Sequence, residues 1–348
     1  MKDRAILYGF SFRHHGAHAG FHGLARALRD QIVVDASPPW PRGLPESVEG
    51  RLNRRWLLYS EWRLRRYFKS EDPRVIHYFF PENTLRHGAD WKGIHRLMAT
   101  CHQPAERIRA GAENPYYKGY IDGLRGADCV VVQSKTEVEP LQTVLGHDRI
   151  VVVPHGVAAD FFTPGRRGNG ASSINVLTVG AWLRDYALWG RIAREICERT
   201  DNIHFTVVTN PDSQAEARRA LGPAHERCRF YHNVSDEFLL SLYDDCDILL
   251  LPLAGAVANN ALLEGMAKGL PVIASDWPAV QEYLGEEAGC TLPNSAVDRW
   301  IETIIHMAGD GSKREAMSRA ARARAVQQYD WTVIAEHYRR LYHSLATR

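Results

Sequence analysis

Short apolar runs recur along this chain, and a stretch with the apolar spacing of a helix follows most of them. Runs of about four to eight apolar residues between turn residues are typical of buried strands. They occupy residues 5–10, 32–36, 75–80, 97–102, 129–133, 150–153, 175–180, 204–209, 247–253 and 271–275. Strands that alternate with helices form parallel βαβ units, in which helices cover both faces of the sheet. The pattern therefore predicts an α/β fold.

A segment rich in glycine and polar residues interrupts this alternation near the middle of the chain. Residues 156–173 read GVAADFFTPGRRGNGASS, a composition typical of linkers between domains. A chain of 348 residues can form two domains, each with its own core. We therefore predict one domain over residues 1–158 and a second over residues 172–329.

The composition is that of an ordinary globular protein, because 45% of the residues are apolar and 24% are charged. The net charge of +2 indicates no general attraction to nucleic acid. The six cysteines form no C-x-x-C pair, which argues against a zinc site or a disulfide framework and favours a reducing cytosol. The first residues have too short an apolar run for a signal peptide, and the longest uncharged run, residues 248–263, is shorter than the ~20 residues of a membrane span. We expect a cytoplasmic protein.

The stretch after the strand at residues 247–253 carries the most specific candidate chemistry. It predicts a helix that begins near Asn260, Ala261 and Leu262 and contains one acid, Glu264. Free N–H groups and the positive end of the helix dipole suit an anion such as a diphosphate. The carboxylate of Glu264 can accept hydrogen bonds from two hydroxyls at once, which fits the vicinal hydroxyls of a ribose. The alternative is that Glu264 is a solvated helix residue beside ordinary helix caps.

A basic segment at residues 51–69 interleaves cations with tryptophan and tyrosine. Its basic residues are Arg51, Arg54, Arg55, Arg63, Arg65, Arg66 and Lys69. This mixture suits a membrane surface that bears anionic lipid, or an acidic acceptor such as a lipid diphosphate. The alternative is a solvated surface helix with an aromatic inner face.

Four histidines, His14, His15, His18 and His22, lie in or near the loop after the first predicted strand. Metal sites combine histidine with carboxylate or thiolate ligands at suitable spacing, and no such partner accompanies these residues. We therefore predict no metal site.

The sequence LLEGMAKGLPVIASDWPAVQEYL, which includes Glu264, resembles the nucleotide-sugar signature of glycosyltransferase family 4. The resemblance is firm over residues 129–342 and looser before them. It implies the GT-B fold, in which two doubly wound Rossmann-like domains face each other across a cleft. By this resemblance residues 1–158 form the acceptor-side domain, residues 172–329 form the nucleotide-sugar donor domain, and the closing helix at 330–348 packs back on the first domain.

The resemblance also implies roles for particular residues. In the family, the acid that matches Glu264 holds the ribose of the donor nucleotide. A glycine loop of the first domain, matched best by Gly16, brings N–H groups to the donor phosphate. A histidine at the end of a strand of the first domain, matched by His102 in TCHQP, faces the donor sugar and positions it for the reaction. Val234 and its backbone lie where members of the family contact the base.

The chain departs from the family pattern at four positions. A first glutamate, near the donor sugar, is replaced here by Ala256, and the asparagine that usually precedes the glycine matched by Gly156 is replaced by His155. An arginine and a lysine that contact the donor diphosphate are replaced by Ala181 and Tyr186. Arg184 is the nearby cation that can take over, because a guanidinium can bind phosphate through two N–H groups.

The predicted function is that of a retaining, hexosyltransferase-type glycosyltransferase. It would transfer a sugar from a UDP- or GDP-linked donor to a hydroxyl of a glycan, a lipid-linked acceptor or a small molecule, as in polysaccharide biosynthesis. By resemblance it needs no metal ion or other cofactor, and it works in the cytoplasm, free or attached at the inner membrane face. The main alternative is a nucleotide-sugar-binding protein without transferase activity. A GT-B isomerase or phosphorylase is a further alternative, which is disfavoured because the sequence lacks the pair of carboxylates of an epimerase-like site.

Overall fold

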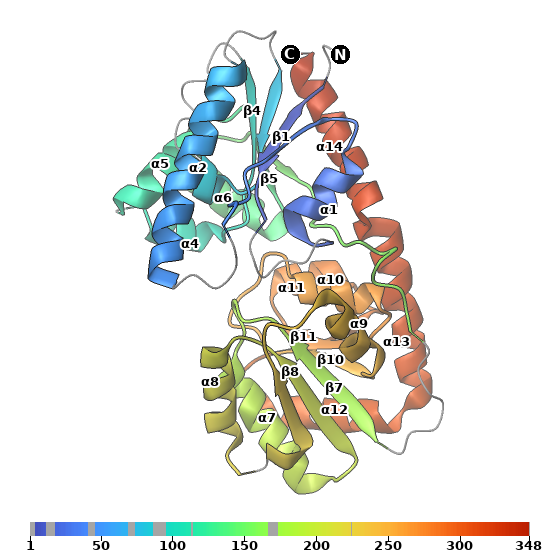
Figure 1. Cartoon of the computed structure of the whole chain (residues 1–348). Helices are drawn as coiled ribbons and strands as arrows, with labels where there is room; N and C mark the ends of the chain where they lie inside the picture. The colour runs from blue at the N-terminus through green and yellow to red at the C-terminus, as the bar shows by residue number, and fades with distance from the viewer. Residues whose placement is uncertain are drawn as a thin grey trace. The chain divides into compact units, whose positions relative to one another are not determined.

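A computed structural model describes residues 4–11, 18–40, 46–68, 74–85, 95–112, 114–165, 173–223 and 225–347. The chain divides into two compact units (Figure 1). Unit 1 comprises Met1–Gly156 together with Trp331–Arg348, and unit 2 comprises Val157–Asp330. The predicted linker at residues 156–173 therefore begins where the chain passes from unit 1 to unit 2.

Unit 1 contains one six-stranded sheet in which every ladder is parallel. Its strands are β1 (Ile6–Gly9), β2 (Ile32–Asp35), β3 (Val75–Tyr78), β4 (Arg96–Thr100), β5 (Cys129–Val132) and β6 (Ile150–Val152). Their order is β2-β1-β3-β4-β5-β6, so the direction of winding reverses between β1 and β3. This is the doubly wound arrangement, in which the switch point lies at the carboxyl ends of those two strands.

Helices flank this sheet, as Figure 1 shows for the part of unit 1 that is described. They are α1 (Gly20–Ala27), α2 (Glu46–Phe68), α3 (Pro81–Thr84), α4 (Ala105–Ala110), α5 (Pro115–Gly126), the 3-10 turn η2 (Lys135–Glu137), α6 (Val138–Leu145) and the C-terminal α14 (Trp331–Ala346).

A buried polar network fixes α14 on the sheet of unit 1. The imidazole of His77 on β3 bonds through Nδ1 to the hydroxyl of Tyr342, 2.7 Å away, and through Nε2 to the hydroxyl of Thr100, also 2.7 Å away. Its ring stacks on Tyr338, with the ring centroids 5.0 Å apart. Burial lowers the pKa of His77 to about 3, so the ring is neutral near pH 7. The last helix of the chain is thus held by specific hydrogen bonds as well as by apolar contact.

Unit 2 contains a second six-stranded parallel sheet, in the order β12-β11-β10-β7-β8-β9. Its strands are β7 (Ile174–Val179), β8 (Ile203–Val208), β9 (Cys228–Tyr231), β10 (Ile248–Leu251), β11 (Val272–Ser275) and β12 (Gly289–Leu292). The helical segments are α7 (Tyr186–Arg199), α8 (Pro211–Leu221), η3 (His225–Arg227), α9 (Asp236–Asp244), α10 (Asn260–Ala267), α11 (Pro278–Leu284), α12 (Val297–Gly309), α13 (Gly311–Arg324) and the π-helical turn η4 (Ala325–Tyr329). The α/β prediction, with two doubly wound sheets, is confirmed.

Two strands of unit 2 were not predicted from the sequence, and both lie at the edges of the sheet. β9 reads CRFY and β12 reads GCTL, and each has only one fully buried residue. A central strand such as β10, by contrast, is buried at every position. An edge strand has fewer neighbours to cover it, so its sequence is less apolar and gives a weaker signal.

The described helices include none that is long and apolar enough to cross a membrane. Among them α2 has the sequence that suggested a membrane surface, and its aromatic side chains divide between the buried and the exposed side. Its buried side consists of Leu57, Glu61, Leu64 and Phe68, whereas the aromatic side chains of Tyr59, Trp62 and Tyr67 are exposed. The helix therefore does not turn these aromatic rings inward.

Candidate functional site

The carboxyl ends of the strands in unit 2 are tied together by a polar network. The hydroxyl of Ser275, at the end of β11, accepts from the amide of Leu253 at 2.7 Å and donates to Oδ1 of Asn294 at 2.6 Å. Nδ2 of Asn294 donates to the carbonyl of Leu253 at 2.9 Å and to Oδ2 of Asp185 at 3.3 Å. Asp185 caps α7 through its other oxygen. Loops after β7, β10, β11 and β12 are thus held in one arrangement, which preorganises this edge.

Asn259 is the N-cap residue of α10. Its Oδ1 accepts from the amide of Leu262 at 3.1 Å, which is an N-cap hydrogen bond. The amide of Leu262 is therefore already used within the chain. Asn260 and Ala261 begin the helix, and in the part of the chain that the structure describes their amides donate to no acceptor. Two of the three amides expected from the sequence thus remain available for an anion.

Glu264 lies one turn further along α10 and is buried, with 8% of its surface exposed. Oε2 accepts a hydrogen bond from the hydroxyl of Tyr243 on α9 at 2.9 Å. Oε1 accepts none from the residues that the structure describes. Burial raises the pKa of Glu264 to about 7, while the Tyr243 hydrogen bond and the charge of Arg184 act in the opposite direction. Glu264 is therefore not a solvated helix residue but a buried acceptor with unused capacity.

Arg184 lies in the loop between β7 and α7, and its guanidinium is fixed by three hydrogen bonds. Nε donates to the carbonyl of Val179 at 2.9 Å, Nη1 to the carbonyl of Trp182 at 3.0 Å, and Nη2 to Oδ1 of Asn259 at 3.1 Å. A guanidinium has five N–H groups, so one remains on each terminal nitrogen. Asn259 accepts from both Arg184 and Leu262, and it therefore places the cation at the N-terminus of α10.

Gly180 makes room for this arginine. Its φ is +99°, a left-handed conformation that L side chains rarely adopt. A Cβ at this position would lie 2.7 Å from Nη2 of Arg184. The glycine is needed both for the turn and for the close approach of the guanidinium.

The arrangement in unit 2 can bind an anion and a diol at the same time. Two helix amides and a fixed guanidinium suit a diphosphate, because both supply N–H donors and positive charge. One turn away, an under-used carboxylate suits two neighbouring hydroxyls. A nucleoside diphosphate carries both groups.

Val234 and His102 lie in different units. Val234 is half-buried in the turn between β9 and α9, directly before Ser235, which caps α9. His102 follows β4 in unit 1, with its ring 4.7 Å from that of Phe79 and 4.4 Å from that of Phe80. Gly16 lies outside the residues that the structure describes, as do His14 and His15.

The structure also shows the burial and contacts of three residues at which the chain departs from the family pattern. Tyr186 is buried at the start of α7, and its hydroxyl donates to the carbonyl of Gly180 at 2.5 Å. Ala256 is half-buried in the loop before Asn259. His155 is buried in unit 1, where its Nδ1 lies 2.9 Å from Nε2 of Gln133.

Three residues that shape the site were missed in the sequence. Asn259 stands directly before the predicted helix, and an asparagine at that place is a recognised N-cap signal. Gly180 follows an apolar strand. A glycine at such a place predicts a turn, but it does not predict the close contact with Arg184. Tyr243 lies 21 positions before Glu264, and no local pattern connects the two.

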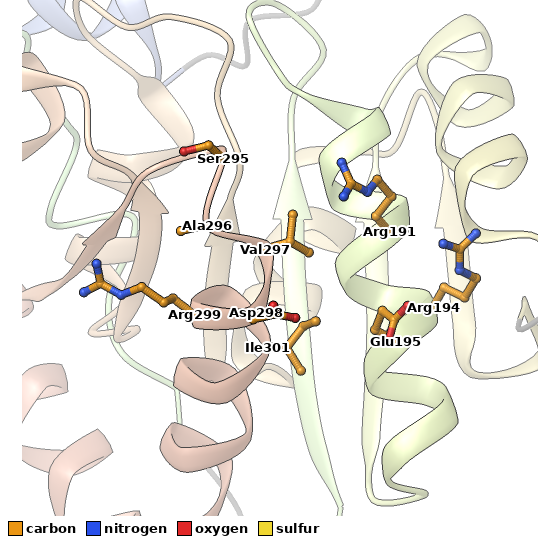
Figure 2. Close-up of a pocket in the computed structure, with 9 residues that line it drawn as sticks. All are labelled: Arg191, Arg194, Glu195, Ser295, Ala296, Val297, Asp298, Arg299 and Ile301. Carbon is orange, nitrogen blue, oxygen red and sulfur yellow. The ribbon is translucent and has the colours of Figure 1, made fainter.

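A cavity of about 500 Å³ lies between α7 and α12 (Figure 2). The residues that line it are Arg191, Arg194, Glu195, Ser295, Ala296, Val297, Asp298, Arg299 and Ile301. Figure 2 shows that Arg194 points out of the cavity, where its Nη1 donates to the carbonyl of Ala220 at 3.3 Å. None of the described residues predicted to bind the donor lines this cavity.

Solved structures with the same architecture define the class of protein. Sucrose-phosphate synthase from Thermosynechococcus elongatus superposes with a TM-score of 0.77 over 99% of this chain and 100% of that chain, at 18% identity. HepE from Anabaena, solved with UDP and glucose, gives a TM-score of 0.74 over 98% of this chain and 100% of that one, at 14% identity. At these identities the likeness shows the fold, and this chain has the GT-B fold.

Family models and relatives identify the family. The model for glycosyltransferase family 4 matches residues 15–161, and the model for glycosyl transferases group 1 matches residues 175–341. A phosphatidyl-myo-inositol mannosyltransferase of Mycobacterium leprae is 29% identical over 93% of this chain and 90% of its own length. A D-inositol 3-phosphate glycosyltransferase of Corynebacterium urealyticum is 25% identical over 64% of this chain and 58% of its own length. The chain therefore contains a glycosyltransferase family 4 domain and a glycosyl transferases group 1 domain, as the signature around Glu264 predicted.

Proposed function

We propose that this protein is a retaining glycosyltransferase that moves a sugar from a UDP- or GDP-linked donor to an acceptor hydroxyl. The observation that carries the proposal is the cluster of Glu264, Arg184 and the α10 amides in unit 2. Glu264 would hold the ribose, and the amides of Asn260 and Ala261 with Arg184 would hold the diphosphate. Val234 would contact the base, and unit 2 would be the donor domain.

The same cluster would assist departure of the diphosphate. During transfer, the bond from the anomeric carbon to the phosphate oxygen breaks and a bond to the acceptor oxygen forms. Negative charge builds up on the leaving diphosphate, and fixed N–H donors stabilise charge at that place. We therefore propose that no metal ion is required. His102 and Gly16 of unit 1, the proposed acceptor-side domain, would position the donor sugar and a phosphate.

The names of relatives suggest which acceptors to test first. The mycobacterial and corynebacterial relatives are both named for acceptors that contain inositol, one lipid-linked and one small. HepE was solved with UDP. We therefore propose a glycan, lipid-linked or small-molecule acceptor, with phosphatidylinositol and inositol phosphate as the first candidates.

Transfer assays with UDP- and GDP-sugars test the proposed activity. We expect product formation that persists in EDTA, and an anomeric proton in the NMR spectrum of the product with the configuration of the donor. An inverted anomeric configuration would contradict retention, and loss of activity in EDTA would contradict metal independence.

A second candidate is a protein that binds a nucleotide-sugar without transferring it. Ala256 in place of an acid near the donor sugar favours this candidate, because it removes one hydrogen-bonding group from the loop before Asn259. This candidate is supported if the protein binds the donor tightly but neither transfers the sugar to any acceptor tested nor slowly hydrolyses the donor.

We also propose that α2 contacts the inner face of the membrane. Tyr67, Tyr59 and Trp62 are 74%, 48% and 47% exposed. The guanidinium of Arg66 lies 5.6 Å from the centre of the Trp62 ring, and that of Arg63 lies 5.9 Å from the centre of the Tyr59 ring. Aromatic rings with adjacent cations suit the headgroup region of an anionic bilayer.

Vesicle co-sedimentation tests this contact. We expect binding to vesicles with anionic lipid and loss of binding in a variant with Trp62→Ala and Arg66→Glu. Arg191→Glu, which changes an exposed arginine of unit 2, is the matched control and is expected to leave binding unchanged. Equal sedimentation of the wild type with neutral and anionic vesicles would rule out the proposed contact.

A further inference from the structure

A buried hydrogen bond joins Tyr243 on α9 to Glu264 on α10. The hydroxyl of Tyr243 donates to Oε2 of Glu264, and the two oxygens lie 2.9 Å apart. The tyrosine is 0% exposed and the glutamate 8%. Oε1 of Glu264 accepts no hydrogen bond from the part of the chain that the structure describes. One oxygen of the carboxylate is therefore fixed, while the other keeps its capacity to accept.

The position of Tyr243 is itself fixed from two sides. Its ring meets that of Phe162 edge-on, with the ring centroids 6.1 Å apart. The next residue, Asp244, forms an ion pair with Lys268, which is 4% exposed and is the C-cap residue of α10. The helices α9 and α10 are thus joined at Glu264 and again one turn later. Two such links limit movement of the hydroxyl away from the carboxylate.

The hydroxyl of Tyr243 also acts on the charge of Glu264. Burial raises the pKa of Glu264 to about 7, and the hydrogen bond from Tyr243 opposes this rise because it stabilises the ionised form. Burial raises the pKa of Tyr243 well above its usual value, so the phenol keeps its proton and remains the donor. The hydrogen bond therefore affects both the orientation and the ionisation of the carboxyl group.

Charged groups from three neighbouring elements also act near Glu264. Asp236, at the start of α9, raises the pKa of Glu264, and Arg184, in the loop before α7, lowers it. The helix α13 packs on α10, and its Arg322 donates to the carbonyl of Ala267, the last residue of α10, at 2.7 Å. Both arginines keep their charge near pH 7. Glu264 is thus the group of this cluster that is expected to titrate there.

We propose that Tyr243 is a positioning residue for donor binding, whose hydroxyl holds one oxygen of Glu264 so that the ionised carboxylate presents the other oxygen to the ribose. This role rests on the proposed function, in which Glu264 binds two ribose hydroxyls. Those hydroxyls donate, and an ionised carboxylate is an acceptor only, whereas a protonated one carries a donor of its own. Without the hydroxyl of Tyr243, the carboxyl group can rotate and takes up a proton more readily, so donor binding weakens for both reasons.

Calorimetric titration of Tyr243→Phe between pH 6 and 8.5 tests this role on the full chain. The ligands are UDP-glucose and GDP-mannose, because the terminal phosphate of UDP or GDP would itself titrate near about pH 6. We expect the wild type to bind more tightly as the pH rises, with half-maximal affinity near pH 7. In the variant we expect this midpoint roughly one pH unit higher, and affinity at pH 7 about three- to tenfold lower. Loss of a merely structural contact would lower affinity without moving the midpoint.

Two further variants serve as controls. Tyr338→Phe removes another buried tyrosine hydroxyl, which lies 3.1 Å from Oγ1 of Thr100 in unit 1. It is expected to leave both the affinity and the midpoint unchanged. Glu264→Gln does not titrate near pH 7, so in that background we expect Tyr243→Phe to weaken donor binding clearly less than in the wild type, and equally at every pH.

The outcomes separate this role from the proposed function. If Glu264→Gln loses donor affinity but Tyr243→Phe keeps the affinity and midpoint of the wild type, the role of Tyr243 is overturned and the donor site stands. If Tyr243→Phe costs the same affinity in both backgrounds at every pH, the tyrosine supports only the packing of α9, which also overturns the role. If Glu264→Gln binds both donors as tightly as the wild type, the proposed donor site itself fails.

Discussion

Replacing Glu264 with glutamine is expected to weaken nucleotide binding at pH 8 and, at the same pH, to stabilise the protein without ligand. Glutamine keeps the shape of the side chain, and its carbonyl oxygen can still accept from the hydroxyl of Tyr243. It loses the negative charge that two ribose hydroxyls would share. Hydrogen bonds to a charged acceptor contribute about 1.5–3 kcal/mol and neutral ones about half as much, so we expect roughly 10- to 100-fold weaker binding.

The stability change follows from the pKa of Glu264, which burial raises from 4.5 to about 7 in the folded protein. The unfolded chain then releases its proton at lower pH than the folded one, so stability falls as the pH rises from about 4.5 to 7 and stays low above it. The shift corresponds to roughly 3 kcal/mol at pH 8 as an order of magnitude. Glutamine does not titrate, so the variant avoids this loss.

Urea unfolding of both proteins at pH 4.5 and pH 8 measures this difference. We expect similar midpoints at the lower pH and a higher midpoint for the glutamine variant at pH 8. Calorimetry with UDP and GDP on the same samples measures the loss of affinity. A variant that binds nucleotide as tightly as the wild type would remove Glu264 from the donor site.

Replacing Arg184 with alanine is expected to reduce affinity for nucleoside diphosphates much more than affinity for the matching nucleosides. The guanidinium has one N–H left on each terminal nitrogen, and such a pair can bind one phosphate group through two hydrogen bonds. Loss of a charge-assisted contact of this kind is expected to weaken diphosphate binding by about 10- to 100-fold.

Arg184→Lys is the informative control for this experiment. Lysine keeps the positive charge but cannot form the three fixed hydrogen bonds to Val179, Trp182 and Asn259. We expect an intermediate loss, still specific for the diphosphate. If alanine weakens nucleoside and nucleoside diphosphate equally, Arg184 supports only the loop and does not contact phosphate.

The fold could be predicted from the sequence because most strands are buried on both faces. A run such as Ile248–Leu251 is apolar at each position, which is typical of a strand covered by helices on both sides. The edge strands Cys228–Tyr231 and Gly289–Leu292 are covered less and were missed. Burial, rather than intrinsic preference for strand, therefore decided which elements were found.

The candidate site could be predicted only where one residue carried its own signal. Glu264 and the start of α10 lie in a recognisable segment, but the use of the Leu262 amide by Asn259 appeared only in the structure. Tyr243 and Glu264, and likewise Arg184 and Asn259, are brought together by packing between elements that are distant in the chain. Sequence spacing contains no information on such pairs until the packing is known.

The central claim is that the Glu264 carboxylate binds the ribose hydroxyls of the donor nucleotide. The most direct test is a double-mutant cycle by calorimetry, with wild type and Glu264→Gln on one axis and a nucleoside diphosphate and its 2′,3′-dideoxy analogue on the other. The account predicts that removal of the hydroxyls weakens binding to the wild type by at least about tenfold and weakens binding to the variant by clearly less. An equal loss of affinity in both proteins would show that the hydroxyls and this carboxylate do not interact.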